Sequence, residues 1–242
     1  MARPRDSELT RRTLLAGIGA GAALSSAHAQ GGESASVDLQ LVLAVDASGS
    51  VSQRRFELQQ KGYVDAFRNP RVIKAIQSGM AGGIAVTMYQ WTGPRLHRPV
   101  FSWTRITDAA SAEALAARLD RSPRLLFGGG TSISGAIDYG VGLYASCPFP
   151  ASRKVIDVSG DGANTSGRLV TDARDEAVSK GVVINGLPIL AIEFDLDRHF
   201  LEEVIGGPGA FMIAAKDFES FGEAIARKLV QEISAAPSLP HG

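Results

Sequence analysis

The stretch "LQLVLAVDASGS", residues 39–50, joins an apolar run to a string of alternating polar side chains. Apolar residues at nearly every position of 39–45 predict a strand that is covered on both faces, as in a parallel sheet. Asp46, Ser48 and Ser50 alternate with small residues, so their oxygens can project to one side where the strand ends. The stretch therefore predicts a buried strand with a polar site at its carboxyl end.

Strand-like and helix-like runs alternate along the chain on the C-terminal side of this stretch. Further strands are expected over 83–91, 98–106, 154–162, 182–190 and 210–215. Helices are expected after Ser52 and over 108–119, 132–145, 171–181, 196–205 and 218–234. The turn-rich residues 92–97 join two of the strands as a hairpin. The order predicts an α/β fold, in which a doubly wound, mostly parallel sheet has one antiparallel edge strand and helices on both faces.

Residues 1–29 have the pattern of an export signal. A basic start is followed by the short apolar stretch "LLAGIGAGAAL" and by "AHA", which predicts cleavage after Ala29. The pair Arg11-Arg12 favours a twin-arginine signal, with a plain secretory signal as the alternative. No later run reaches membrane-spanning length, so we expect a periplasmic or secreted protein. The expected organisation is a signal at 1–29, a short segment at 30–37, one domain at 38–234 and a loose tail at 235–242.

Charge and cysteine content restrict the classes of partner and of covalent stabilisation. The chain has 25 basic and 25 acidic residues, and this balance gives no support for a nucleic-acid or anionic-membrane partner. Cys147 is the single cysteine of the sequence, so an internal disulfide is excluded and a structural thiol is expected.

Oxygen-bearing side chains follow or precede three of the expected elements. Thr131 comes after "GGG" at the start of a helix, and Asp161 ends a later strand. Together with the three polar side chains after the first strand they could supply hydroxyl and carboxylate oxygens to one point. Mg²⁺ prefers such ligands, and Mn²⁺ or Ca²⁺ would also suit them. The competing interpretation of the first string is a helix cap, which is the more common use of Asp and Ser at such places.

Three motifs in this order resemble the von Willebrand factor type A domain with a metal-ion-dependent adhesion site. They are "DASGS", "GGGTSIS" and "VIDVSGDG", and the resemblance covers roughly 38–234. Within it, "WTGP", "INGLPI" and "VIGGPGAF" look like an exported bacterial subgroup. The resemblance implies that the metal-site residues are Asp46, Ser48, Ser50, Thr131 and Asp161. It also implies a protein-binding module, in which an acidic group of an unknown partner completes the coordination of the ion.

Two features depart from the family pattern. Asp157 falls inside a strand, about 13 Å along it from Asp161, so the two cannot share one ion and a buried, paired carboxylate is expected. The acidic residues Glu193, Asp195 and Asp197 follow a strand whose end should lie at the same edge. They form either a solvated loop or a group that tunes which partners can approach.

Enzymatic signatures are weak. After the predicted signal the histidines are His97, His199 and His241, and His199 is expected on a helix surface. The sequence contains no G-x-S-x-G string, and "GGGTS" lacks the lysine of a phosphate-binding loop. We therefore expect no enzyme. The alternatives are a metal-assisted phosphatase or hydrolase and a metal-independent structural envelope protein.

Overall fold

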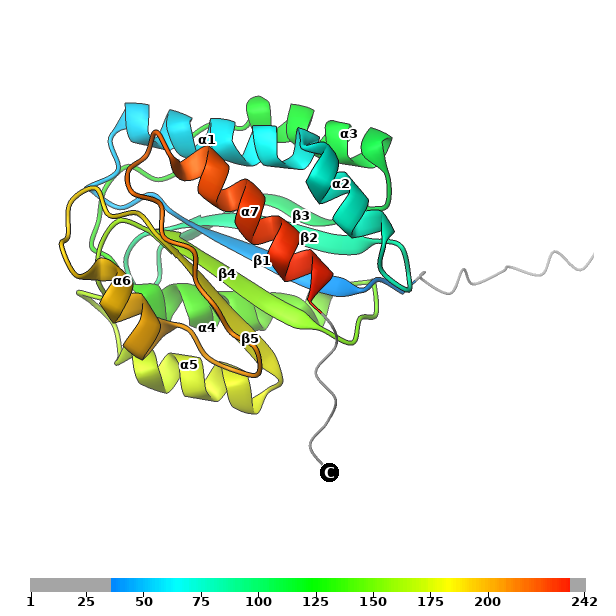
Figure 1. The fold of residues 1–242 in the computed structure, drawn as a ribbon. Helices are drawn as coiled ribbons and strands as arrows, with labels where there is room; N and C mark the ends of the chain where they lie inside the picture. Colours follow the sequence, from blue (N-terminus) through cyan, green and yellow to red (C-terminus); the bar gives the residue numbers. More distant parts are fainter. Residues whose placement is uncertain (1–35, 236–242) are drawn as a thin grey trace, which may run out of the picture. The chain divides into compact units, whose positions relative to one another are not determined.

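Figure 1 shows the computed structural model of the chain, in which residues 36–235 are described. The predicted signal, its cleavage after Ala29 and nearly all of the predicted tail lie outside these residues. The strands are β1 (Leu39–Asp46), β2 (Ile84–Trp91), β3 (His97–Ile106), β4 (Lys154–Gly160) and β5 (Val182–Pro188). They form one sheet in the order β3-β2-β1-β4-β5, in which β3 runs antiparallel to β2 and the other pairs are parallel.

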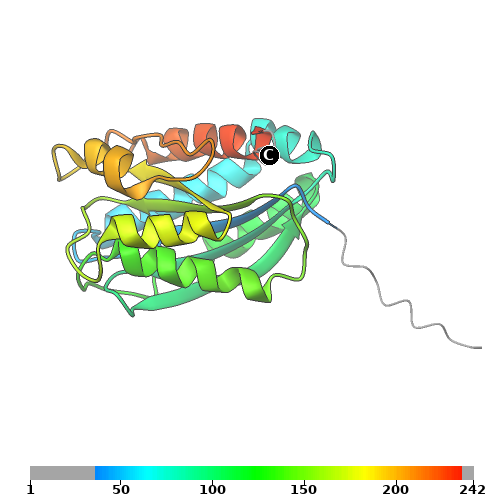
Figure 2. The same cartoon turned by 90° about the horizontal axis from the view of Figure 1, so that it is seen from below.

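Helices cover both faces of this sheet (Figure 2). One layer contains α1 (Gln53–Arg68), α2 (Pro70–Gln77), α3 (Ala109–Asp120) and α7 (Phe221–Ser234). The other contains α4 (Ile133–Leu143), α5 (Val170–Ser179) and α6 (Leu196–His199), which continues into a π-helical turn at Phe200–Val204. The predicted doubly wound sheet with an antiparallel edge strand is confirmed. Among residues 36–235, no helix has both the length and the apolar character needed to cross a membrane.

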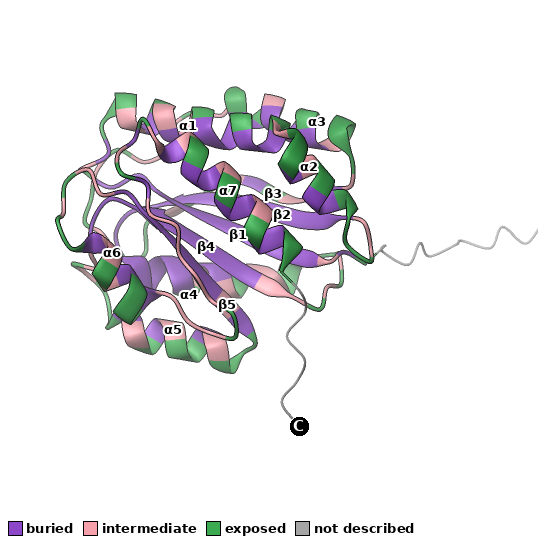
Figure 3. Cartoon of the chain, viewed as in Figure 1, coloured by how far each residue is buried: buried purple, intermediate pink, exposed green. Residues whose placement is uncertain are grey.

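The first strand is buried on both faces, as the continuous apolar run predicts (Figure 3). Leu41 and Leu43 pack into the core beneath α1 and α7, whereas Val42 and Ala44 pack into the core beneath α4 and α5. This alternation follows from the two-residue period of a strand. The rigid central strand therefore ends with Asp46 at a fixed point between the two helix layers.

The expected strand over 210–215 is wrong. This segment runs beside β5 but makes only isolated bridges, between Met212 and Gly186 and between Ala215 and Ile189. The amide of Phe211 donates to the side chain of Asn185 at 2.9 Å, so this amide is used outside a regular ladder. Sequence patterning detected the apolar segment but could not show that a side chain of the neighbouring strand intercepts one of its amides.

Candidate metal centre

The predicted site residues lie on three loops at the carboxyl edge of the sheet. Asp46 is the last residue of β1, Asp161 directly follows β4, and Thr131 lies one residue before Ser132, which caps α4. Because β1 and β4 are neighbouring parallel strands, their ends bring the two aspartates together. Ligand sites of open α/β sheets form at such carboxyl ends.

Four of the five predicted residues form a continuous chain of hydrogen bonds. The amide of Ser48 donates to Asp46 Oδ1 at 2.7 Å, and the hydroxyls of Ser48 and Ser50 lie 3.0 Å apart. Ser50 Oγ donates to Asp161 Oδ1 at 2.5 Å, and the amide of Asp161 donates to Asp46 Oδ2 at 3.4 Å. The alternating string after β1 therefore turns its oxygens toward the end of β4, and the helix-cap interpretation does not hold. Ser52 caps α1 instead, accepting from the amide of Arg55.

Thr131 reaches the same place through its backbone. Its carbonyl accepts from the amides of Thr165 at 2.9 Å and Ser166 at 3.1 Å, which belong to the loop after β4. Its hydroxyl lies 3.7 Å from the point where a side chain at Gly162 would begin. In the described part of the chain this hydroxyl makes no direct hydrogen bond to the other four site residues. Thr131 therefore borders the cluster across Gly162.

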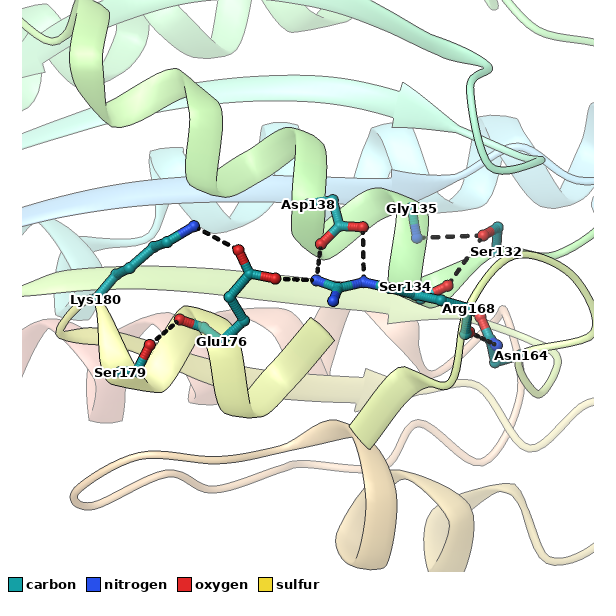
Figure 4. A network of polar contacts seen from close by, with 9 residues as sticks. All are labelled: Ser132, Ser134, Gly135, Asp138, Asn164, Arg168, Glu176, Ser179 and Lys180. Atoms are coloured by element: carbon teal, nitrogen blue, oxygen red, sulfur yellow. Dashed lines mark hydrogen bonds and ion pairs between the residues drawn. The ribbon is translucent and has the colours of Figure 1, made fainter. Parts of the chain in front are cut away.

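A polar network joins helix α4, which begins just after Thr131, to the loop after β4 and to α5 (Figure 4). Asn164 Oδ1 accepts from the amide of Ser134 at 3.0 Å, and Asn164 Nδ2 donates to the carbonyl of Arg168 at 3.1 Å. The Arg168 guanidinium donates to both oxygens of Asp138 on α4 and to Glu176 on α5, at 2.7 Å from the latter. A bidentate arginine fixes orientation as well as distance, so α4 and the loop after β4 are held together by side chains that do not enter the site.

The electrostatics of the cluster suit a cation. Burial raises the pKa of Asp46 to about 7, and the negative charge of Asp161 adds to this effect. Burial also raises the pKa of Asp161, against the hydrogen bond from Ser50. Asp161 Oδ2 is buried, and no residue of 36–235 donates a hydrogen bond to it. Two buried carboxylates side by side are costly, the Arg55 guanidinium 3.7 Å from Asp161 Oδ2 offsets part of that cost, and a divalent ion would offset more of it.

Two arginines flank the cluster, and sequence reasoning missed both. Arg55 Nη1 donates to the carbonyl of Ser50 at 2.7 Å and lies 3.7 Å from Asp161 Oδ2. Arg124 donates to the carbonyl of Ala47 at 3.2 Å and lies over the ring of Phe127. The first could have been found, because a residue three positions after a helix cap lies in the first turn at this edge. The second reaches the site only through the tertiary fold.

Small residues leave room for the carboxylates. A Cβ atom at Gly160 would lie 3.1 Å from Asp46 Oδ2, which is tighter than ordinary contact. Gly129 has a φ of +110° and precedes Thr131 by two residues, so the loop takes a path that other residues rarely adopt. The glycines around the site therefore admit the close approach of backbone and carboxylate.

The structure bears on four further residues for which an expectation was drawn from the sequence. Asp157 is buried and paired, as expected, with Lys228 Nζ 2.8 Å away. The expectation that His199 decorates a helix surface is wrong, because its side chain is largely buried and its Nε2 accepts from the amide of Asn164 at 3.3 Å. Cys147 is half-buried and donates to the carbonyl of Phe149. Glu193 is not simply solvated, since its Oε2 accepts from the amide of Ala163 at 2.8 Å.

The donor set is dominated by hydroxyls. Within 36–235, no three His, Cys, Asp or Glu side chains gather into a metal cage. An ion at this edge would therefore depend on Ser48, Ser50 and Thr131 as well as on the two aspartates. Such a mixture of neutral and anionic oxygens fits a hard cation such as Mg²⁺.

A family model described as "Protein of unknown function (DUF1194)" matches residues 36–237. The chain belongs to this family. The fold of this DUF1194 protein is that of a von Willebrand factor type A domain, so the resemblance noted in the sequence is confirmed at the level of the fold. No curated protein sequence matches the chain significantly.

Solved structures share the fold at low sequence identity. Proximal thread matrix protein 1 from the mussel byssus, solved with a zinc-occupied MIDAS motif, is 14% identical over 84% of this chain and 47% of its own, with a TM-score of 0.58. A von Willebrand factor type A protein from Catenulispora acidiphila is 15% identical over 82% of this chain and 43% of its own, with a TM-score of 0.57. The pilus adhesin SpaC from Lactobacillus rhamnosus GG is 15% identical over 81% and 31%, with a TM-score of 0.55. The DUF1194 chain spans less than half the length of each of these proteins.

Proposed function

We propose that this DUF1194 protein is an exported protein-binding module that uses a divalent ion, with Mg²⁺ as the first candidate. Asp46, Ser48, Ser50, Thr131 and Asp161 would hold the ion. When bound, the ion supplies a positive centre that attracts a carboxylate from the partner. The observation that carries the proposal is the hydrogen bond from Ser50 to the buried Asp161, because it joins residues 111 positions apart into one oxygen cluster. The zinc-occupied motif of the mussel protein is consistent with this assignment.

Exposed apolar side chains around the site support a protein partner. Eight large hydrophobic side chains of the described chain are exposed, and six of them lie on loops at the carboxyl edge of the sheet. We call these six the apolar rim: Leu96, Leu125, Phe127, Leu169, Ile192 and Phe194. Phe194 is 93% exposed and Phe127 is 74% exposed. Several exposed apolar side chains at one edge of a sheet are typical of interaction surfaces, and a macromolecular partner could cover them while its carboxylate meets the ion.

Metal binding is tested by calorimetric titration of the protein with Mg²⁺ and Mn²⁺. Wild type should bind one ion, and Asp161→Ala should weaken binding by at least about tenfold. The matched control is Asp175→Asn, which removes an exposed carboxylate on α5 and should bind as wild type does. Absence of binding to wild type at millimolar Mg²⁺, or equal binding to wild type and Asp161→Ala, would contradict the proposal.

The alternative functions give different results in two further assays. A metal-assisted phosphatase would turn over p-nitrophenyl phosphate, and this turnover would be lost in Asp161→Ala. A structural envelope protein would retain its partners in the presence of a chelator. The binding module predicts no turnover, and association that is lost both with the chelator and in Asp161→Ala.

A further inference from the structure

Glu193 brings a carboxylate to the border of the candidate metal centre, beside Gly162 and Ala163. It lies in the loop between β5 and α6, at the same edge of the sheet as the ends of β1 and β4 (Figure 1). Its Oε2 accepts from the amide of Ala163, two residues after Asp161, at 2.8 Å. Its Oε1 lies 3.4 Å from the point where a side chain at Gly162 would begin, and Thr131 Oγ1 lies 3.7 Å from that same point. The free oxygen of Glu193 and the hydroxyl of Thr131 therefore border on the same small residue.

The loop turns this side chain inward and its neighbours outward. Ile192 is 51% exposed and Phe194 is 93% exposed, whereas Glu193 is only partly exposed and is hydrogen-bonded to the Asp161 loop. The other acidic residues of the segment behave differently. Asp195 is exposed and caps no helix with its side chain, and Asp197 accepts from the amide of Arg198 next to it. Of these three, only Glu193 is hydrogen-bonded to the loop that follows Asp161.

The inward position of Glu193 is electrostatically unfavourable by itself. Its negative charge is felt by Asp161, which is already buried beside Asp46. Like charges repel one another unless a cation lies near them. Arg55, 3.7 Å from Asp161 Oδ2, and one backbone hydrogen bond to Glu193 offset part of this cost, and a cation bound at the neighbouring centre would offset more of it.

We propose that Glu193 is the chain's own carboxylate beside the bound ion, and that a partner's carboxylate must overcome the negative charge of Glu193 to reach the ion. This inference rests on the proposed function. An internal acidic group is present at a high effective concentration, so it competes with any carboxylate from outside. Glu193 would thus strengthen ion binding and at the same time raise the affinity that a partner needs. Weakly binding carboxylates of the surrounding medium would then be kept from the ion.

The test uses Glu193→Gln, which keeps the shape of the side chain and an oxygen for the Ala163 amide but removes the charge. The matched control is Asp195→Asn, which removes the same charge from the same loop at a position that does not contact the site. Each protein is first titrated with Mn²⁺. The Mn²⁺-saturated protein is then titrated with acetate, and the relaxation rate of water protons reports how many waters the acetate displaces from the ion.

Glu193→Gln should bind Mn²⁺ about tenfold more weakly than wild type and, once saturated, should bind acetate at least about fivefold more tightly. Asp195→Asn should match wild type in both titrations. Normal Mn²⁺ binding to wild type, with Glu193→Gln unchanged in both titrations, would overturn this inference alone. Failure of wild type to bind Mn²⁺ would overturn the proposed function and this inference together. Equal melting temperatures of the three proteins would show that the loop substitutions leave the fold intact.

Discussion

Lys228 is a buried cation on α7, and its replacement by an uncharged residue should strongly destabilise the fold. Its Nζ lies 2.8 Å from Asp157 Oδ1 on β4 and 3.1 Å from Glu232 Oε1 on its own helix, and all three side chains are fully buried. Asn185 Nδ2 also donates to Glu232 at 2.7 Å, so the cluster joins α7 to two strands. In Lys228→Met the hydrocarbon stem is largely retained, and the loss is mainly that of the charge. Breaking one partner of a buried ion pair costs about 3–5 kcal/mol, so we expect a loss of that size in the free energy of unfolding.

The loss should also depend on pH. Burial raises the pKa of Asp157, and the positive charge of Lys228 opposes that rise. Without Lys228 the pKa rises further, so the folded protein keeps a proton that the unfolded chain releases above about pH 4. Stability then falls as pH increases, because the unfolded state binds fewer protons. The deficit of Lys228→Met should be larger at pH 8 than at pH 5, by about 1–2 kcal/mol.

Urea denaturation followed by circular dichroism at pH 5 and pH 8 measures both quantities. Lys180→Met is the matched control, because it removes an exposed lysine paired with Glu176 and should cost less than about 0.5 kcal/mol. The double variant Asp157→Asn/Lys228→Met should recover at least about 1 kcal/mol of the single variant's loss, since one uncompensated carboxylate is gone. A loss below about 1 kcal/mol for Lys228→Met, or a loss that shrinks toward pH 8, would refute this reasoning.

Three further substitutions probe the site and its support. Ser50→Ala removes a hydroxyl of the oxygen cluster and should weaken Mg²⁺ binding at least about tenfold in a calorimetric titration; unchanged affinity would exclude it as a ligand. Gly160→Ala pushes a Cβ to 3.1 Å from Asp46 Oδ2 and should lower stability by about 1–3 kcal/mol in urea. Its control Gly142→Ala has open space on α4 and should gain about 0.5–1 kcal/mol, so equal effects of the two would contradict the packing argument. Arg168→Met cuts the clamp between α4 and α5, and hydrogen exchange of residues 161–169 should accelerate; unaltered exchange would show that the clamp does not order the loop.

The fold could be predicted because its main elements have strong local patterns. The continuous apolar run of β1 predicts a strand covered on both faces, and the spaced apolar residues of α7 predict a helix with one face in the core. The sequence also contains the signal for the break between α1 and α2, because Asn69 ends one helix and caps the next before Pro70. Helix α2 itself was not among the expected elements. The segment 210–215 was mistaken for a strand because an apolar pattern does not show which amides a neighbouring side chain will take.

Within the site, the sequence predicted only the residues that belong to its three motifs. Asp46, Ser48, Ser50 and Asp161 come together because parallel neighbours end at one edge, which the strand pattern implies. The contacts of Arg124 and Glu193 depend on the paths of long loops, for which no periodicity exists. The sequence indicated that Glu193 lies at this edge, but its contact with Ala163 and that of Arg124 with Ala47 could not be derived from spacing.

The most direct test of the proposed metal centre is a crystal structure of the protein grown with Mn²⁺, recorded at an X-ray energy where manganese scatters anomalously. The account predicts one strong anomalous peak at the carboxyl edge of the sheet, in direct contact with the hydroxyls of Ser48 and Ser50. The peak should vanish in crystals of Asp161→Ala. A strong peak elsewhere on the chain, or none at this edge in saturating Mn²⁺, would contradict the account.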